Sequence, residues 1–474
     1  MRRPVSLVSA GAVTFGVGLS ALAVLQQRAF WTGRFDVGNL TQAVWSTAHG
    51  DVLEVTGLTG RQFSRLGAHF DPIVAAFAPL WWVWPDPSLL LVTQAAAVAT
   101  GAIPVYLLGR RHLESDWAAA GFGLAYLLHP ATQWLVLDDF HPVALATPLL
   151  LWGFWFLDTD RLVPFAIVAG AACLTKEQIG LVVAAMGVWY AVRPGRRRIG
   201  IAVCVIGIIV SVVAVAVVVP HYAPGGGSPF AGRYESVGGS PGGMVETAVT
   251  DPGAIVGAAT GGRDLAYLAD LLVPLLCLPL LAPLAAFTAL PELALNLLSD
   301  TRTQTSIHFH YTAGALPGLM VAAVLGAARL RRRHAWARRP DGRAIVVSTL
   351  VAGILLGPLP IWAHVPFGSD LAAREHVVGG HAEIAERAIR LVPADAAVSA
   401  TNTLGAHLSE RRRIFSFPVL REATWVVVDR TRPSYRDRAD EPEMFAAALA
   451  RIEASGRFEP VFDEDGILVL RRVR

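Results

Sequence analysis

The chain has 474 residues, of which 54% are hydrophobic and only 16% are charged, and its mean hydropathy is +0.48. Soluble globular proteins contain about 25% charged residues, so this composition excludes an ordinary soluble protein. The net charge of +3 comes from arginines gathered in short clusters between apolar runs and near the C-terminal end. Such clusters are typical of membrane loops, and we expect no nucleic-acid partner. The three cysteines lie in apolar runs, which indicates neither a disulfide framework nor a cysteine metal site.

The long apolar runs predict roughly eleven membrane-spanning helices, since one span needs about 20 apolar residues. Lys and Arg in short loops mark the cytoplasmic side of a membrane protein. One orientation, with the N-terminus in the cytoplasm, places every basic cluster inside, and it places the C-terminal domain outside the cytoplasm. The expected spans are about 5–26, 87–109, 117–137, 142–157, 162–174, 178–192, 199–219, two short kinked spans within 265–298, 311–330 and 344–364.

We therefore expect an all-α polytopic membrane domain over residues 1–368 and a small extracytoplasmic α/β domain over residues 369–474. The membrane domain has a first external loop over residues 28–86. A second external loop, over residues 221–264, is rich in Gly and Pro and could act as a mobile cover. In the tail, apolar patterning predicts short strands, an amphipathic helix and a hairpin around an Asp-Gly pair.

The first external loop carries the segment RFDVGNLTQAVWSTAHGD, which predicts an amphipathic helix at the membrane interface, beginning near Asp36. Asp36, Asn39 and Gln42 lie on the polar side of this helix. Asp36 either caps the helix or has a chemical function, and the two interpretations are compatible. Farther along the loop, Arg61 could bind a phosphate, although a solvated loop charge is the commoner case.

The same loop ends at His69 and Asp71, directly before the run PIVAAFAPLWWVWP. This run is too short to span comfortably and predicts a re-entrant or interfacial helix with tryptophans at the headgroup level. Asp71 precedes Pro72 and could simply cap that helix. Ionisable residues at the mouths of spans are costly, so both residues are also candidates for substrate binding.

Two further external segments carry clustered polar residues. The turn LDDFHPVA places Asp138, Asp139 and His141 between two spans. Paired carboxylates beside a histidine could bind a metal or share a proton, and a hydrated turn with a helix cap is the alternative. The segment TRTQTSIHFHY carries His308 and His310, whose alternation would turn both side chains the same way in an extended chain. A phosphate or a metal would suit them, but two histidines alone do not define a site.

The chain contains a single lysine, Lys176, which stands beside Glu177 in the segment CLTKEQIG. This segment lies between two short expected spans, at an outer or membrane-embedded turn. Every other basic residue apart from histidine is an arginine. In so arginine-biased a chain, a lysine that was merely a solvated charge should have been an arginine. We therefore expect a functional role for the pair, with a structural ion pair as the alternative.

The chain resembles DUF2079, a family of bacterial and archaeal multi-spanning membrane proteins known as a domain of unknown function. The resemblance covers most of the chain. It rests on the ordered segments FDVGNLTQAVWSTAHG, HFDPIVAAFAPLWWVWPDPSLLLVTQAAAVATGAIPVYLLGRR, DDFHPVALATPLLL and LTKEQIGL. That family is in turn similar to class C (GT-C) glycosyltransferases, which include the protein O-mannosyltransferases and the lipid A aminoarabinose transferases. Those enzymes use a polyprenyl-phosphate-linked sugar as donor.

The resemblance implies a GT-C-like fold and transfer of a sugar from a polyprenyl-phosphate donor to an envelope acceptor. Asp36 matches the acidic position just after the first span in those enzymes and would be the general base. The class often has an acidic pair there, whereas RFDVG has one acid, so metal dependence stays open. The candidate cofactor is a divalent cation, Mg²⁺ or Mn²⁺. Lys176, Arg61 or a histidine could neutralise the departing phosphate.

Two other classes of function stay open. A lipid or small-molecule transporter or flippase would need polar residues along a mid-membrane path and usually an internal repeat. Here the ionisable residues gather on one side instead. A non-catalytic membrane scaffold, whose external domain binds a partner, is the other alternative. The Ala-, Gly- and Arg-rich composition with one lysine indicates a GC-rich bacterium, so we expect a multi-pass protein of the bacterial plasma membrane.

Overall fold

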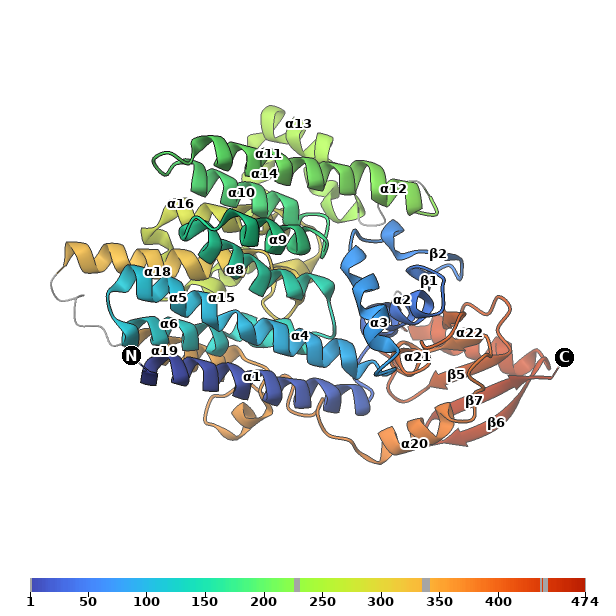
Figure 1. Cartoon of the computed structure of the whole chain (residues 1–474). Helices are drawn as coiled ribbons and strands as arrows, with labels where there is room; N and C mark the ends of the chain where they lie inside the picture. The colour runs from blue at the N-terminus through green and yellow to red at the C-terminus, as the bar shows by residue number, and fades with distance from the viewer. Residues whose placement is uncertain (1, 226–230, 335–341, 435–436, 438–441, 474) are drawn as a thin grey trace. The chain divides into compact units, whose positions relative to one another are not determined.

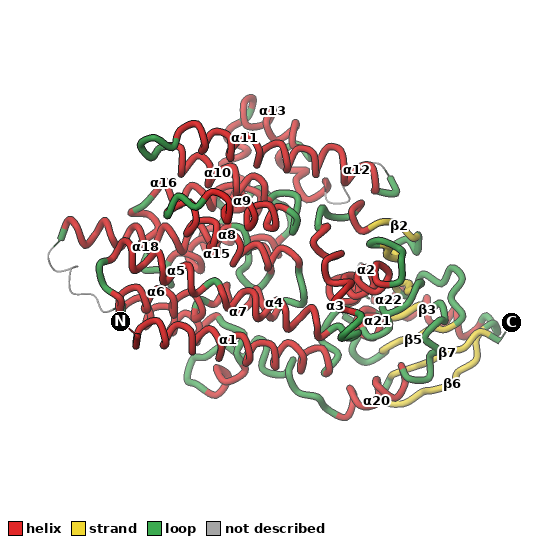
Figure 2. The backbone as a smooth tube through the Cα atoms, viewed as in Figure 1, coloured by secondary structure: helices red, strands yellow, loops and turns green. Residues whose placement is uncertain are grey.

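The computed structural model describes residues 2–225, 231–334, 342–434, 437 and 442–473 (Figure 1). Among these residues helices predominate, and strands occur in the first external loop and in the C-terminal tail (Figure 2). The chain forms two compact units, each of which is described by itself. Unit 1 comprises residues 1–20, 68–71 and 93–373, and unit 2 comprises residues 21–67, 72–92 and 374–474.

Unit 1 is a bundle of helices, most of them short. It includes most of α1 (Arg2–Arg28) and part of α4 (Ser88–Thr100). The other helices of this unit are α5 (Ala102–Leu113), α6 (Asp116–Leu128), α7 (Pro130–Leu137), α8 (Ala146–Asp158), α9 (Leu162–Cys173), α10 (Ile179–Ala191), α11 (Arg197–Val213), α12 (Val219–Tyr222), α13 (Pro241–Thr250), α14 (Pro252–Ala259), α15 (Gly262–Leu272), α16 (Pro283–Ala286), α17 (Leu290–Leu297), α18 (Ala315–Arg333) and α19 (Arg343–Leu356).

Within the described part of the chain, three helices are long and apolar enough to cross a membrane. They are Arg3–Arg28, Ser88–Leu113 and Arg197–Tyr222, each of 26 residues. These three coincide with the first, second and seventh expected spans. Among the described residues, the other expected spans do not correspond to single helices that are long and apolar enough to cross a membrane. The shorter apolar helices are Pro72–Trp81, Pro142–Asp158, Leu162–Cys173, Ile179–Ala191, Pro283–Leu297 and Arg343–Leu356.

Proline explains where several apolar runs break, because it lacks the N–H that a helix interior needs. The expected span 117–137 divides after His129, and Pro130 starts α7. The run 265–298 divides into α15, α16 and α17 with short 3-10 turns between them. The 3-10 turn Leu278–Leu281, α16 and α17 each carry a proline in their first turn. The expected kinks in this run are confirmed, but the pieces are shorter than spans.

Helices α10 and α11 lie side by side at an unusually close distance (Figure 1). A Cβ atom added to Gly180 would stand 2.5 Å from the carbonyl oxygen of Gly207, and one added to Gly187 would stand 2.7 Å from that of Gly200. Only glycine allows two helix backbones to approach so closely. Small residues at helix contacts are typical of packing in membranes, where lipid gives helices no hydrophobic reason to associate.

Ionic contacts gather the loops that were expected in the cytoplasm. Asp158, at the end of α8, accepts a hydrogen bond from Arg193 Nη2 at 2.7 Å. The same carboxylate lies 2.9 Å from Arg111 Nε and 3.0 Å from His112 Nε2. Asp158 is only 4% exposed, so its charge depends on these partners. The contacts agree with the expected alternation, which places the ends of α5, α8 and α10 on one side.

The long external loop contains more regular structure than its composition predicts. Residues 226–230 of this loop lie outside the described part. Residues 335–341, in a different loop, also lie outside it, and they include the end of the expected basic cluster at 331–339. Helix α13 is capped by Ser240, whose Oγ accepts from Gly243 N, and α14 by Asp251, whose Oδ1 accepts from Ala254 N. The described part of this loop thus holds two capped helices, where its glycine content had favoured a flexible cover.

Unit 2 contains a five-stranded sheet with the strand order β4-β3-β5-β7-β6. Strand β3 pairs in parallel with β4 and β5, whereas β5, β7 and β6 are antiparallel. The hairpin between β6 and β7 turns at Asp465 and Gly466, which have φ angles of 48° and 81°; a two-residue turn favours Asp-Gly there. This small sheet domain and its hairpin confirm the prediction from the tail sequence. The strands are β3 (Val398–Ala400), β4 (Ile414–Ser416), β5 (Trp425–Asp429), β6 (Phe458–Glu464) and β7 (Ile467–Arg472), and the helices of the tail are α20 (Gly380–Ile389), α21 (Asn402–Ala406) and α22 (Pro442–Ala454).

The expected orientation can be tested with single cysteines at exposed positions. In a chain whose three native cysteines are replaced by alanine, we expect Glu453→Cys to react with a membrane-impermeant maleimide in right-side-out vesicles. Arg198→Cys, in the basic segment after α10, should react only after the vesicles are opened. Both side chains are exposed, so burial does not decide the result. The reverse labelling pattern would contradict the orientation derived from the basic clusters.

Candidate functional site

Asp36 lies in the first turn of a helix in unit 2. Residues Arg34–Gly38 form a π-helical turn, which continues directly into α2 (Asn39–Ala48). The helix therefore begins close to Asp36, as predicted. Gly33 occupies the N-cap position, and Asp36 is half-buried within the first turn, so a capping role and a chemical role for Asp36 both stay predictions. Short π-helical turns are rare and occur frequently at functional sites.

Arg34 anchors this turn inside unit 2. Its guanidinium is 2% exposed and donates hydrogen bonds to the carbonyl oxygens of Thr56 at 2.8 Å and Ile414 at 2.6 Å. A third bond runs to Ser416 Oγ at 2.5 Å. Burial lowers the pKa of Arg34 to about 10, which leaves it charged at neutral pH. Residues of the first external loop and of the sheet thus meet at one buried arginine that the sequence patterns did not single out.

The other candidates in this loop have different surroundings. Gln42 is buried, and its Nε2 donates to Thr56 Oγ1 at 3.0 Å while its Oε1 accepts from Thr56 N at 2.9 Å. Asn39 Oδ1 accepts a hydrogen bond from Arg65 Nη1. Through these hydrogen bonds Gln42 and Asn39 stabilise the fold of unit 2. Arg61 is exposed near the turn of a small hairpin formed by β1 (Glu54–Thr56) and β2 (Gln62–Ser64).

In unit 1, loops that were expected outside the cytoplasm meet around Glu177. Its Oε2 accepts a hydrogen bond from Phe70 N at 2.9 Å, and its Oε1 lies 3.0 Å from His69 Nδ1. Ser211 Oγ, on α11, donates to the carbonyl oxygen of Glu177 at 2.7 Å and so holds the turn. The sequence had favoured a functional role for Lys176 and Glu177, with a structural ion pair between them as the alternative. In the structure Glu177 has a partner from another loop, His69, and the charge of Lys176 also acts on it.

The charge of Glu177 is set by competing effects. Burial opposes ionisation and by itself raises the pKa of the carboxyl group. The positive charge and hydrogen bond of His69, together with the charge of Lys176, outweigh burial and lower the pKa to about 2. Glu177 is therefore ionised at neutral pH, and its pairing with His69 joins the loop 68–71 to the turn before α10.

Lys176 and Arg233 meet at one aromatic ring. Lys176 Nζ lies 5.4 Å from the centroid of the Tyr311 ring, which is a cation–π distance. Arg233 Nη1 donates to the Tyr311 hydroxyl group at 3.4 Å. The Tyr311 ring also lies 4.3 Å from the ring of His310. The two cations could bind an anionic group, and the charge of Lys176 also acts on the carboxyl groups of Glu177 and Glu292. Sequence reasoning found Lys176 but missed Arg233, which is one of many arginines.

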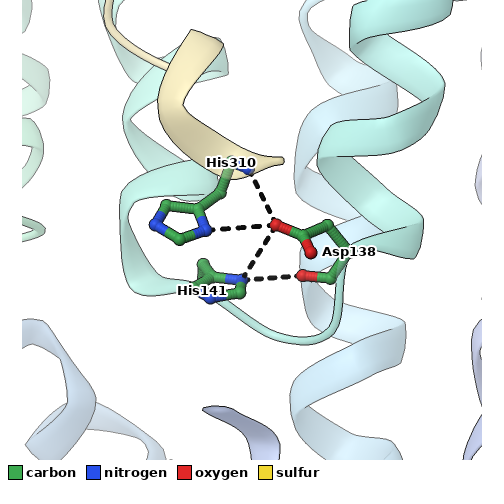
Figure 3. A group of neighbouring side chains, drawn as sticks. All are labelled: Asp138, His141 and His310. Carbon is green, nitrogen blue, oxygen red and sulfur yellow. Dashed lines mark hydrogen bonds and ion pairs between the residues drawn. The ribbon is translucent and has the colours of Figure 1, made fainter. Parts of the chain in front are cut away.

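The turn between α7 and α8 lies beside the segment that precedes α18 (Figure 3). Asp138 Oδ2 accepts a hydrogen bond from His310 N at 2.8 Å and lies 3.1 Å from His310 Nδ1. His141 Nδ1 lies 2.7 Å from the carbonyl oxygen of Asp138. The rings of His141 and His310 are stacked, with centroids 3.6 Å apart. The sequence named both carboxylates of this turn, and the one that lies beside the two histidines is that of Asp138.

Gln94 holds this turn in place from α4. Its buried Nε2 donates to the carbonyl oxygens of Val136 at 3.1 Å and Asp139 at 2.7 Å, and its Oε1 accepts from His141 N at 2.8 Å. Asp139 has a φ angle of 52°, a left-handed conformation that is uncommon outside glycine. The bonds from Gln94 stabilise that conformation. A polar residue inside an apolar run was the available signal for Gln94, and it was missed.

Two expected site residues lie apart from the cluster of Asp138, His141 and His310. The ring of His308 packs against that of Trp134, with centroids 4.8 Å apart. The alternation of His308 and His310 therefore directs the two rings to different partners. Asp71 is 2% exposed and directly precedes the 3-10 helix Pro72–Phe77, where the sequence predicted a helix to begin.

Burial and the charges of neighbouring groups keep His310 neutral. Burial, together with the positive charges of His141 and Lys176, lowers the pKa of His310 well below its ordinary value. A neutral imidazole keeps a lone pair that can accept a hydrogen bond or bind a metal. In the described part of the chain, Asp138, His141 and His310 place one potential metal-ligand atom each within 4.8 Å of one another. The cluster combines one carboxylate, two imidazoles and nearby cations.

The sequence matches the model of the predicted membrane protein family DUF2079 over residues 27–469. The protein belongs to the DUF2079 family. No curated protein matches its sequence. Two solved structures of ArnT from Cupriavidus metallidurans, a GT-C glycosyltransferase, resemble this DUF2079 protein. ArnT bound to undecaprenyl phosphate has a TM-score of 0.52 at 15% identity over 97% of each chain. ArnT in the apo state has a TM-score of 0.53 at 14% identity over 97% of this chain and 98% of its own.

These likenesses confirm two expectations from the sequence. The family is the one that the ordered motifs suggested, and the fold of this DUF2079 protein is ArnT-like. At 14–15% identity the likeness shows the fold alone, so any activity has to be argued from the residues of the site.

We expect Glu177→Gln to destabilise this protein by about 1–3 kcal/mol near neutral pH, because glutamine cannot pair its charge with His69. Folding lowers the pKa of Glu177 from 4.5 to about 2. Its contribution is therefore fully present above about pH 4.5 and is lost as the pH falls toward about 2. Thermal unfolding in detergent should show a gap between wild type and variant at about pH 6 that shrinks below about pH 4.

The exposed Glu453→Gln variant is the control for that measurement and should unfold like the wild type. A gap for Glu177→Gln that stayed constant through the acidic range would show that the ionised carboxylate contributes no stability.

Proposed function

We propose that this DUF2079 protein is a membrane glycosyltransferase that moves a sugar from a polyprenyl-phosphate donor to an extracytoplasmic acceptor. The observation that carries the proposal is the pairing of Lys176 and Arg233 at the ring of Tyr311. A lysine in a chain that otherwise uses arginine, together with an arginine from a distant loop, supplies charge-assisted hydrogen bonds of the kind that bind phosphate oxygens.

The lipid part of the proposed donor rests on the fold. ArnT, whose fold extends over 97% of this chain, has been solved with undecaprenyl phosphate bound. A polyprenyl chain would need an apolar groove between helices beside a polar end for its phosphate, and an apolar bundle with proline-broken helices can provide one. The ArnT-like fold therefore supports a polyprenyl phosphate as the lipid carrier. It leaves the sugar and the acceptor to experiment.

The proposed reaction displaces the lipid phosphate from the sugar. The oxygen of an acceptor hydroxyl attacks the anomeric carbon of the sugar, and the bond between that carbon and the phosphate oxygen breaks. The bonding electron pair leaves with the phosphate, and the hydroxyl proton passes to a general base. Lys176 and Arg233 would stabilise the extra negative charge that develops on the departing phosphate monoester.

Asp36 is the proposed general base, because it matches the acidic position of class C enzymes just after their first span. Its place in the π-helical turn supports this role, since the bonds of buried Arg34 hold that turn rigidly within unit 2. A carboxylate on a rigid element can take a proton with little reorganisation.

We expect Asp36→Asn to lower the rate of sugar transfer by about 100- to 10,000-fold, the usual contribution of a general base. The assay uses purified full-length protein in detergent, radiolabelled polyprenyl-phosphate sugars and an envelope fraction as acceptor. Asp51→Asn, an exposed aspartate in the same loop, is the matched control and should transfer at the wild-type rate.

The two possible failures of this assay have different meanings. Transfer by Asp36→Asn at the wild-type rate would exclude Asp36 as the base and leave the transferase intact. An absence of transfer by the wild type with every donor would count against the transferase itself, in favour of the transporter and scaffold alternatives.

A further inference from the structure

We propose that Asp138, His141 and His310 bind a zinc-type transition-metal ion. The three residues form a compact group at one end of the helices of unit 1 (Figure 3). Asp138 and His141 come from the turn between α7 and α8, and His310 comes from the segment before α18. Only the folded bundle brings these two segments together, since they lie more than 160 residues apart in the sequence.

The distances among the candidate ligand atoms suit a tetrahedral metal ion. Asp138 Oδ2 lies 3.1 Å from His310 Nδ1 and 3.9 Å from His141 Nδ1. Ligands around a tetrahedral zinc ion, with bonds of about 2.0–2.1 Å, stand about 3.3–3.4 Å apart. The two observed distances lie on either side of this separation, and a turn of one of the two stacked rings about its χ angles would direct all three atoms at one ion.

The group is enclosed but still accessible. The side chains of both histidines are 12% exposed, and that of Asp138 is 19% exposed. Enclosure strengthens the attraction between a carboxylate and a cation, because less water screens it. Three protein ligands with one remaining accessible side are also the arrangement of catalytic zinc sites, which keep a fourth position for an exchangeable ligand.

The stacking of the two imidazoles brings two potential metal ligands together beside one carboxylate. The ring centroids of His141 and His310 are 3.6 Å apart, and the rings are inclined by only 20°. His310 Nδ1 contacts the carboxylate of Asp138, whereas His141 Nδ1 lies nearer the backbone carbonyl oxygen of Asp138. A dication beside the carboxylate would bind one lone pair of each neutral ring, and the N–H of each ring would then stand on its other nitrogen.

A rigid support holds the ligand-bearing turn. The three hydrogen bonds of Gln94 fix the backbone of residues 136–141, including the amide of His141 itself. Outer contacts of this kind orient metal ligands before the ion arrives and thereby reduce the entropy cost of binding.

The donor atoms decide which metal fits. Two imidazoles and one carboxylate suit Zn²⁺ and neighbouring transition metals, whereas Mg²⁺ prefers six oxygen ligands in an octahedron. We therefore favour zinc at this group over the Mg²⁺ or Mn²⁺ that the family resemblance suggested. The Tyr311 ring lies 4.3 Å from that of His310, so the ion would stand close to the proposed phosphate position. A role in phosphate binding rests on the proposed transferase, but binding of the ion itself does not.

The test measures zinc bound by the full-length protein, purified in detergent through a tag without histidine and stripped with a chelator. We expect one zinc per wild-type chain by elemental analysis, with an affinity measured by competition against a metal indicator. His310→Ala, His141→Ala and Asp138→Ala should each weaken binding by at least about 10–100-fold. His308→Ala is the matched control. His308 stands two residues before His310, but its ring packs against Trp134, so this variant should bind zinc like the wild type.

A second variant separates ligation from folding. His310→Cys keeps a zinc-binding donor and should recover affinity that His310→Ala loses, and Co²⁺ bound to the wild type should show the visible absorption of a tetrahedral site. The proposal is overturned if the wild type binds no zinc, if His308→Ala loses as much affinity as His310→Ala, or if Mg²⁺ displaces zinc at comparable concentration. Zinc binding without any sugar transfer would refute the proposed transferase and leave the metal site standing.

Discussion

The cost of placing charged groups in an apolar bundle organises unit 1. Ionised side chains that leave water need partners. The partners of Asp158 come from the end of α5 and from the segment directly after α10, and they gather the loops at one end of the helices. Glu177 and Asp138 do the same for loops expected on the other side, through His69 and His310. Because each carboxylate holds residues from distant segments, the polar clusters and the helix packing stabilise one another.

The same constraint concentrates potential chemistry in a small region. The single lysine, an arginine, a tyrosine and two stacked histidines lie in successive contact there, linked through Tyr311 and His310. Cations beside an aromatic ring suit a phosphate, and imidazoles beside a carboxylate suit a metal. A lipid-phosphate donor needs charge neutralisation of this kind when its phosphate departs. The residues of this cluster could thus bind the phosphate and the metal ion proposed for this ArnT-like fold.

The sequence predicted the features that depend on local pattern. The first apolar helix, the start of the helix near Asp36 and the Asp-Gly hairpin all follow from neighbouring residues. What it could not supply were partners across the fold. It grouped Glu177 with its neighbour Lys176 and did not show the contact with His69, and it did not show which of Asp138 and Asp139 contacts the histidines. It also overestimated span length, because a hydropathy pattern does not show where Pro130 ends one helix and begins another.

The affinity for undecaprenyl phosphate, measured on the purified protein in detergent, tests the central claim most directly. The account predicts that the wild type binds this lipid and binds undecaprenol, which lacks the phosphate, far more weakly. Lys176→Ala should weaken binding of the phosphate lipid by about 10–100-fold, whereas Lys176→Arg, which keeps the charge, should retain most of it. Equal affinity of wild type and Lys176→Ala for undecaprenyl phosphate, or no discrimination against undecaprenol, would contradict the claim that this cluster binds a lipid phosphate.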